Sequence, residues 1–370
     1  MLNVAPNIFH LSRVLEARHC QAVTDDGIKG LCVSVDDFGR ANAGRGQCKS
    51  IHTLDIFGTN VTNKGIQMAL ENLPDLKIFD FDYQIQVLAE LLRGPSRKNL
   101  RCLPNLTSLH NIGFTRVDPI CQRGDIELVA TTCVSVNKVR IEKKAIVKNG
   151  QTDVTVLELL KFEKLFDLFF RGDIFHESEL TFNGGILPHL KHFSNSLTSL
   201  SFEFLSNTLV NISAIVENCP KLQTLNIVAA KISPPSRLEN EPLPPKRMKT
   251  NLVLENLKTL KLHRCDDLTS FDLDLLLASP ALEELKLWRI DLPIDDCLRK
   301  AANFHQFRNL QRLDFVLLTS VTKTGIDLLM NDCNSLNVIK IVYCRSLNVS
   351  DMEEWKKMAL EKNWDVTFQF

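Results

Sequence analysis

The chain has 370 residues, 44 lysines and arginines against 44 aspartates and glutamates, and a hydrophobic content of 44%. This is ample apolar material for a core, and the balanced charge argues against wholesale binding to nucleic acid or to a membrane surface. No apolar run approaches the roughly 18 residues of a membrane-spanning helix. We therefore expect neither nucleic acid nor membrane as a partner.

The first 20 residues read MLNVAPNIFHLSRVLEARHC and lack the basic start, apolar stretch and cleavage site of a signal peptide. The chain has 11 cysteines, an odd number, and no C-x-x-C pair. Together these features predict a reducing, intracellular compartment with free thiols, and they remove the common zinc arrangements. We expect no metal and no cofactor.

A phrase of the form V-T-x-x-G-I occurs at 23–28, 61–66 and 321–326. A helical run, a C/P-x-L element and an alternating strand follow it. Thr62, Thr269 and Thr322 each stand where a helix would begin, so we expect their side chains to cap these helices. The phrase therefore predicts one structural unit, made of a strand exit, a helix and a return to the next strand.

The pattern L-x-x-L-x-L, with Ile, Val or Phe allowed, recurs through the whole chain. Ile51 and Leu76 lie 25 residues apart, and Leu222 and Leu257 lie 35 apart. Most spacings are near the period of about 20–29 residues of a leucine-rich repeat. The copies begin at Ile51, Leu76, Leu106, Val136, Leu165, Leu197, Leu222, Leu257, Leu282, Leu310 and Leu336.

This periodicity predicts an α/β leucine-rich-repeat solenoid, a horseshoe of about twelve repeats that spans 1–370 as a single domain. The parallel sheet should line the concave face and the helices the convex face. Segments 37–49 and 231–251 break the rhythm and are predicted to be loop insertions, because their glycines, prolines and charges cannot build a core. A C-terminal helix at Asp351–Lys362, with Trp355, should shield the last repeat before a strand at Val366–Phe368.

The repeat also explains the cysteines. Cys219 and Cys333 are predicted at helix ends, and Cys20, Cys265 and Cys344 at strand exits. At a strand exit the side chain can satisfy backbone groups that the turn would leave unpaired. We therefore interpret these thiols as structural rather than as ligands or nucleophiles.

The phrases C-x-x-V-T-D-D-G-I (20–28), V-T-x-x-G-I, N-C-P-K-L (218–222) and C-R-S-L (344–347) resemble the cysteine-containing class of leucine-rich repeats. That class is best known from F-box/leucine-rich-repeat proteins. The resemblance implies protein–protein recognition as the substrate-binding component of a Skp–cullin–F-box ubiquitin ligase, with Skp and cullin subunits as partners, in the cytoplasm or the nucleus. No L-P-x-E-x-x-x-x-I/L run of an F-box precedes the repeats. An F-box-free adaptor or inhibitor and, in a different class, a GTPase regulator remain the alternatives.

Segments that could carry chemistry are incomplete. AGRGQCKS (43–50) lacks both anchoring glycines of a phosphate-binding loop, and FHESEL (175–180) lacks the second histidine of a zinc protease motif. PPKRMK (244–249) is either a nuclear-import or acidic-partner patch or a solvated loop. We expect no catalytic residues and no enzymatic activity.

The variable positions of each strand should face away from the core on the concave surface. In the later repeats they place Lys261, Lys286 and Lys340 in a positive strip interrupted by Asp314. Exposed aromatic side chains beside cations are typical of protein-binding hot spots, so we predict that this face binds an acidic or phosphorylated protein segment. The alternative is that neighbouring side chains neutralise the bases. The predicted partner-binding residues are Lys261, His263, Lys286, Trp288, Arg312, Lys340 and Tyr343.

Overall fold

The structure is a computed structural model of residues 1–370. It describes residues 13–32, 34–35, 41–42, 48, 50–100, 102–111, 121–142, 152–172, 180–205, 208–234, 253–330 and 335–369. The chain divides into two units, Met1–Leu168 and Phe169–Phe370, each described by itself below. Unit 2 carries all seven predicted partner-binding residues.

Unit 1 alternates short parallel strands with helices. Strand β4 lies between β1 and β5, and β6 pairs with β7; β2 and β3 form a small antiparallel pair. Its elements are β1 (Val14–Glu16), α1 (Asp25–Cys32), β2 (Ser34–Val35), β3 (Ala41–Asn42), β4 (Thr53–Asp55), α2 (Asn63–Asn72), β5 (Ile78–Asp80), α3 (Gln84–Arg93), η2 (Pro95–Asn99), η3 (Leu103–Asn105), β6 (Ser108–Asn111), α4 (Asp125–Thr132), β7 (Lys138–Glu142), α5 (Thr152–Leu157) and η5 (Glu158–Lys161).

Unit 2 has the more regular repeats. Its strands form one parallel sheet in the order β8, β9, β11, β13, β14, β15, β16, β17. Strand β8 contains the division between the units, and β10 pairs with β12 in a separate two-stranded sheet. The elements are β8 (Asp167–Arg171), η6 (Phe182–Ile186), α6 (Leu187–His192), β9 (Ser199–Glu203), β10 (Leu209–Val210), α7 (Ile212–Asn218), β11 (Thr224–Val228), β12 (Lys231–Ile232), β13 (Thr259–His263), α8 (Ser270–Leu277), β14 (Glu284–Trp288), α9 (Ile294–His305), β15 (Arg312–Val316), α10 (Lys323–Asp327), β16 (Val338–Val342), α11 (Val349–Glu361) and β17 (Thr367–Gln369).

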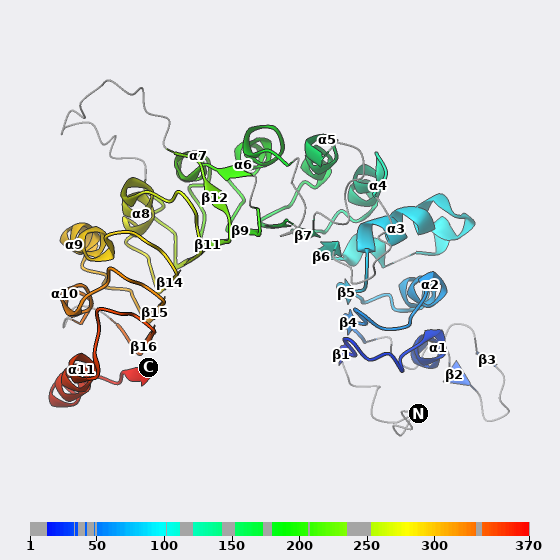
Figure 1. Cartoon of the computed structure of the whole chain (residues 1–370). Coiled ribbons are helices and arrows are strands. Elements are labelled where there is room, and N and C mark those ends of the chain that lie inside the picture. The colour runs from blue at the N-terminus through cyan, green and yellow to red at the C-terminus, as the bar shows by residue number, and fades with distance from the viewer. Residues whose placement is uncertain are drawn as a thin grey trace. The chain divides into compact units, whose positions relative to one another are not determined.

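In unit 2 the strands lie side by side. The helices α7 to α11, which connect successive strands, all lie on one side of them (Figure 1). Each of the predicted L-x-x-L-x-L copies supplies one strand, which confirms the predicted α/β solenoid. Residues alternate along a strand because successive side chains point to opposite faces. In β13, Leu260 and Leu262 are buried, whereas Thr259, Lys261 and His263 are partly exposed.

The leucines of neighbouring repeats stack in register and form the core. Leu260 pairs with Leu285, and Leu285 with Leu313, and all three are completely buried. Burial of such a side chain contributes roughly 1.5–3 kcal/mol. The repeats of unit 2 therefore stabilise one another through a continuous apolar layer between strands and helices.

The chain leaves strands β9, β11, β13, β14, β15 and β16 with one backbone geometry. The residue directly after β13, Arg264, has a left-handed backbone with φ of 50° and donates its N–H to the carbonyl of Trp288 at 3.0 Å. The next residue, Cys265, donates its thiol to the carbonyl of Ile227 in the preceding repeat at 3.5 Å. Cys344 makes the equivalent bond to Phe315 at 3.6 Å. The predicted structural role of these two cysteines is confirmed.

The helix starts agree only in part with the prediction. The Thr62 side chain accepts a hydrogen bond from the Lys64 N–H at 3.2 Å, and Thr269 forms a capping box with Asp272. Thr322 also stands at the N-cap, but its side chain makes no capping bond. Its hydroxyl donates to a carboxylate oxygen of Asp295 at 2.5 Å instead, so the capping prediction for Thr322 is wrong.

The C-terminal helix α11 begins and ends close to the predicted bounds. Trp355 is fully buried and donates its indole N–H to Asp327 at 2.7 Å, so it does shield the last repeat. Two parts of the predicted insertions are described: Ala41–Asn42 forms β3, and Lys231–Ile232 forms β12. Most of 37–49, the rest of 231–251 from residue 235 with PPKRMK, and Cys333 lie outside the described residues.

Candidate functional site

The strand face of unit 2, formed by the outward residues of β13 to β16, brings the predicted partner-binding residues into rows. In one row Lys261 lies beside Lys286, Lys286 beside Asp314, and Asp314 beside Lys340. In the next row His263 lies beside Trp288. The structure thus brings six of the seven residues together on four adjacent strands, with Tyr343 directly after β16.

The lysine row is not a continuous positive strip, because two carboxylates pair with its bases. Glu284 accepts Lys286 at 2.8 Å, Lys261 at 3.6 Å and Arg312 at 3.9 Å. Lys340 pairs with Asp314 at 3.5 Å. Neighbouring side chains therefore neutralise part of the charge, as the alternative interpretation anticipated.

The environment of Glu284 holds this carboxyl in its charged form. Burial raises its pKa, but the hydrogen bond from Lys286 and the charges of Lys261, Lys286 and Arg312 outweigh burial, so the pKa lies below its ordinary value. Glu284 therefore remains a stable counter-ion for the bases around it. Sequence reasoning missed Glu284, although its position two residues before Lys286 puts both side chains on the same face of β14.

His263 and Trp288 form a flat aromatic surface, which we call the platform. Their ring centroids lie 4.0 Å apart and the ring planes differ by 7°. The Trp288 side chain remains 45% exposed. Burial, followed by the nearby charges of Arg264 and Arg289, lowers the pKa of His263, so the ring is neutral at pH 7.

The residues directly after β9, β11, β13, β14, β15 and β16 form a further row along one edge of the strand face, which we call the rim row. All of them have a left-handed backbone, with φ from 49° to 55°. In the later repeats the row presents two exposed arginines and then two exposed apolar side chains, Leu317 at 43% and Tyr343 at 78%. The rim row consists of Phe204, Ala229, Arg264, Arg289, Leu317 and Tyr343.

Sequence reasoning missed every member of this row except Tyr343, including Arg264, Arg289 and Leu317. The available signal was their constant position, one residue beyond each alternating strand. Tyr343 was found, but as a member of the lysine surface rather than of the rim row. The exposed apolar side chains therefore lie in the platform and the rim row, whereas the bases of the lysine row have carboxylate partners.

Acidic side chains on the strands of the early repeats are also paired. In unit 1, Arg18 contacts Asp55 at 2.9 Å and Asp80 at 3.5 Å, and His110 lies 2.8 Å from Asp80. Asp80 is buried, and Arg18 also lies over the ring of Phe57. This surface is therefore a closed network of internal contacts rather than an open acidic face.

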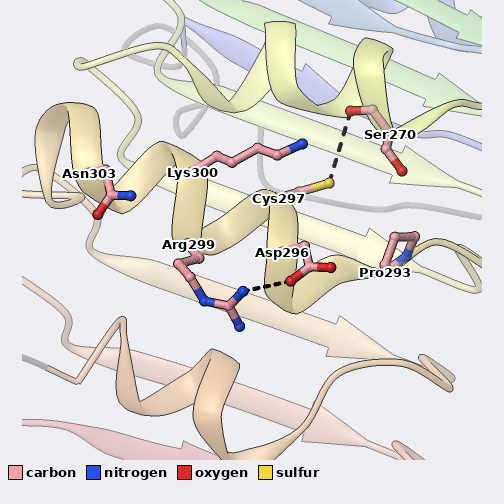
Figure 2. Close-up of a pocket in the computed structure, with 7 residues that line it drawn as sticks. All are labelled: Ser270, Pro293, Asp296, Cys297, Arg299, Lys300 and Asn303. Atoms are coloured by element: carbon pink, nitrogen blue, oxygen red, sulfur yellow. Dashed lines mark hydrogen bonds and ion pairs between the residues drawn. The ribbon is translucent and has the colours of Figure 1, made fainter.

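A cavity of about 230 Å³ lies on the helix side of unit 2 (Figure 2). Its charged side chains have partners: Arg299 contacts Asp296 at 2.6 Å, and Lys300 contacts Asp274 at 2.6 Å. Cys297 donates its thiol to the Ser270 carbonyl at 3.9 Å. Burial and then the nearby Asp274 raise the pKa of this thiol to about 12, so it carries no thiolate for nucleophilic chemistry at neutral pH.

Other thiols are similarly unreactive. Burial raises the pKa of Cys219 and of Cys265 to about 12. Among the residues that the structure describes, no group of histidines, cysteines and carboxylates could hold a metal ion. Within the same ranges, no helix is both long and apolar enough to cross a membrane.

The regular parallel strands, the covering helices and the inward cysteines and leucines define a leucine-rich-repeat solenoid. The chain is similar in structure to a chain in the crystal structure of the Rad7–Elc1 complex of yeast, with a TM-score of 0.58, 13% identity, and coverage of 96% of this chain and 80% of that one. It also matches an internalin of Listeria monocytogenes, inlF, with a TM-score of 0.46, 13% identity, and coverage of 87% of this chain and 74% of that one. No protein-family model and no curated protein sequence matches the chain. At these identities the likeness concerns the fold.

Proposed function

We propose that the chain is a non-enzymatic protein-recognition module that binds its partner on the strand face of unit 2. The observation that carries this proposal is the exposure of large apolar side chains on an otherwise regular face. Trp288, Leu317 and Tyr343 all lie at or beside the rim row, and each is more than two-fifths exposed. Large exposed aromatics beside cations are typical of binding hot spots, and parallel solenoid strands offer a broad, rigid surface for recognition.

The chemistry of the described residues supports a binding role. The buried thiols with a raised pKa are not nucleophiles at neutral pH, and the charged groups of the helix-side cavity already have partners. In contrast, the platform is rigid, because the two rings stack and both strands are hydrogen-bonded on each side. A rigid aromatic surface loses little conformational entropy on binding.

The specific form of the proposal is a substrate-binding component linked to Skp–cullin–F-box type ubiquitin ligation. It rests on the resemblance of the repeat phrases to F-box/leucine-rich-repeat proteins. It is in line with the occurrence of a chain of similar fold in the complex of Rad7 with Elc1. An adaptor or inhibitor without a ligase link is the competing form.

The test is purification of the tagged chain from its native cells, beside two double variants. W288A/Y343A removes the exposed aromatics of the strand face, and F304A/L360A removes two exposed apolar residues of helices α9 and α11. We expect one partner set to be retained by the wild-type chain and by F304A/L360A but lost with W288A/Y343A. Loss in neither variant, or equal loss in both, contradicts the proposed surface.

The identity of the retained proteins decides between the specific forms. Skp and cullin subunits support the ligase role, whereas a single retained partner without them supports the adaptor or inhibitor. A retained GTPase whose hydrolysis the purified chain accelerates, with loss of that acceleration on replacement of one arginine, favours the regulator class instead.

A further inference from the structure

The unneutralised positive charge of the strand face lies in the rim row. Glu284 forms ion pairs with Lys261, Lys286 and Arg312, and Asp314 forms one with Lys340. Arg264 and Arg289, in contrast, have no carboxylate within 4 Å among the residues that the structure describes, and both are exposed. These two guanidinium groups are therefore available to an external anion.

Their position relative to the platform is fixed by the backbone. Arg264 directly follows His263, Arg289 directly follows Trp288, and the two strands are neighbours in register. Main chains of adjacent strands lie about 4.8 Å apart. The two arginines therefore stand next to the platform in the chain, and their charges add to burial in lowering the pKa of His263.

The row continues with apolar side chains on the next two strands. Leu317 follows β15 and Tyr343 follows β16, and the N–H of Leu317 is hydrogen-bonded to the carbonyl of Val342 at 2.9 Å. A ligand that crosses these strands meets two cations, then an aliphatic and an aromatic side chain, with Trp288 in the adjacent row. Guanidinium forks bind carboxylates in a bidentate manner, and the platform offers an apolar face.

We infer that the platform and the rim row from Arg264 to Tyr343 bind an extended acidic peptide segment, with its carboxylates on Arg264 and Arg289 and an aromatic or aliphatic side chain on Trp288, Leu317 and Tyr343. This inference rests on the proposed function and specifies its partner. Charge complementarity supports it: β13 to β16 and the residue after each contain six lysines and arginines but only two carboxylates, Glu284 and Asp314. Single-stranded RNA also stacks on aromatics beside arginines. The two carboxylates and the apolar end of the row disfavour it.

The test uses the full chain and a displayed library of random peptides. R264N/R289N removes both charges, and asparagine adopts the left-handed backbone more readily than most residues. R299Q/R308Q removes two exposed charges elsewhere in unit 2 and is the matched control. Thermal unfolding of each variant confirms that it is folded before binding is measured.

We expect selection on the wild-type chain to enrich peptides with Asp or Glu next to an aromatic or aliphatic residue. The best peptide, labelled and titrated by fluorescence anisotropy, should bind R264N/R289N at least about tenfold more weakly and R299Q/R308Q with unchanged affinity. Its affinity for the wild-type chain should fall as salt rises. Enrichment of neutral or basic peptides, absence of enrichment, or equal affinity for R264N/R289N overturns the inference.

A labelled oligouridylate tests the nucleic-acid possibility. Tighter binding of this RNA than of the selected peptide, with loss in R264N/R289N, overturns the acidic-peptide inference. Capture of the native partner by R264N/R289N but not by W288A/Y343A also overturns it, yet leaves the proposed protein-recognition function in place. If neither R264N/R289N nor W288A/Y343A changes capture of the native partner, both the acidic-peptide inference and the proposed binding surface are contradicted.

Discussion

The carboxylate of Asp295 occupies the space into which a side chain on Gly325 would extend. A Cβ atom at Gly325 would lie closer to Asp295 Oδ1 than real Cβ atoms approach any neighbour. The same carboxylate accepts the N–H of Thr322 at 3.1 Å and its hydroxyl at 2.5 Å. An aspartate in the first turn of α9 thus holds the start of α10 in the next repeat.

The arrangement recurs in unit 1. Asp25 at the start of α1 accepts the N–H of Thr62 at 2.8 Å and its hydroxyl at 2.6 Å, and it stands where a Cβ of Gly65 would be. At 61–66 and 321–326, two of its three copies, the V-T-x-x-G-I phrase therefore has a physical cause. Its threonine binds the carboxylate of the preceding repeat, and its glycine leaves room for that carboxylate.

We expect Gly325→Ala to lower the free energy of unfolding by about 1–3 kcal/mol, because the added methyl group displaces the Asp295 carboxylate. Gly30→Ala is the control: it also lies in a helix, but a Cβ there meets nothing within 4 Å. That substitution should be neutral or slightly stabilising. Urea unfolding of both variants measures the difference, and equal effects contradict the proposed clash.

The contact also predicts coupling between the two positions. Asp295→Ala alone should destabilise the chain by about 1–3 kcal/mol, since the partly buried donors of Thr322 lose their acceptor. In the Asp295→Ala background Gly325→Ala should cost much less than in the wild-type chain, because the group it collides with is gone. A double-mutant cycle by urea unfolding measures this, and strictly additive effects would show that the two residues act independently.

The strands were predictable because burial alone dictates their pattern. Leu260, Leu285 and Leu313 are fully buried, and each belongs to an alternating apolar pattern in its own strand. That pattern identifies the buried face of a strand without knowledge of which strands pair with it. The cysteines at the strand exits were predictable for a similar reason, since Cys265 and Cys344 each stand at the same sequence separation from the end of the preceding strand.

The electrostatics of the site were not predictable, because they depend on register and geometry. Glu284 meets Lys261 only once β13 and β14 are paired. Thr322 shows the same limit, since its partner Asp295 lies in another repeat. The left-handed backbone at Arg264 was equally hidden, because arginine does not favour it and the hydrogen bond from its N–H to Trp288 forms only in the paired strands.

In the rim row we expect an alanine-to-glycine substitution to stabilise the chain, whereas such a substitution usually destabilises a protein. Ala229 has φ of 49°, a conformation that disfavours side chains but not glycine. Ala229→Gly should therefore raise the free energy of unfolding by about 0.5–1 kcal/mol. Ala302→Gly, at a similarly exposed site inside helix α9, should lower it by about 1 kcal/mol. Thermal unfolding of the pair measures both signs, and destabilisation by Ala229→Gly would contradict the strain argued for this row.

The platform predicts a pH dependence of stability. Burial, Arg264 and Arg289 lower the pKa of His263 in the folded chain below its ordinary value of 6.5. The unfolded chain then takes up the proton more readily, so the stability that neutral His263 contributes is present above about pH 6.5 and is lost as the pH falls through the lower, folded pKa. The chain should therefore lose stability on acidification below about pH 6.5, and His263→Gln should lose less.

Proton NMR titration of the His263 ring measures the folded pKa directly. In R264N/R289N we expect this pKa to rise towards the ordinary value without reaching it, because burial beside Trp288 is the larger cause and remains. R299Q/R308Q should leave the pKa unchanged. A His263 pKa at or above 6.5 in the wild-type chain, or a pKa that does not respond to loss of the two arginines, would show that their charges do not converge on the platform.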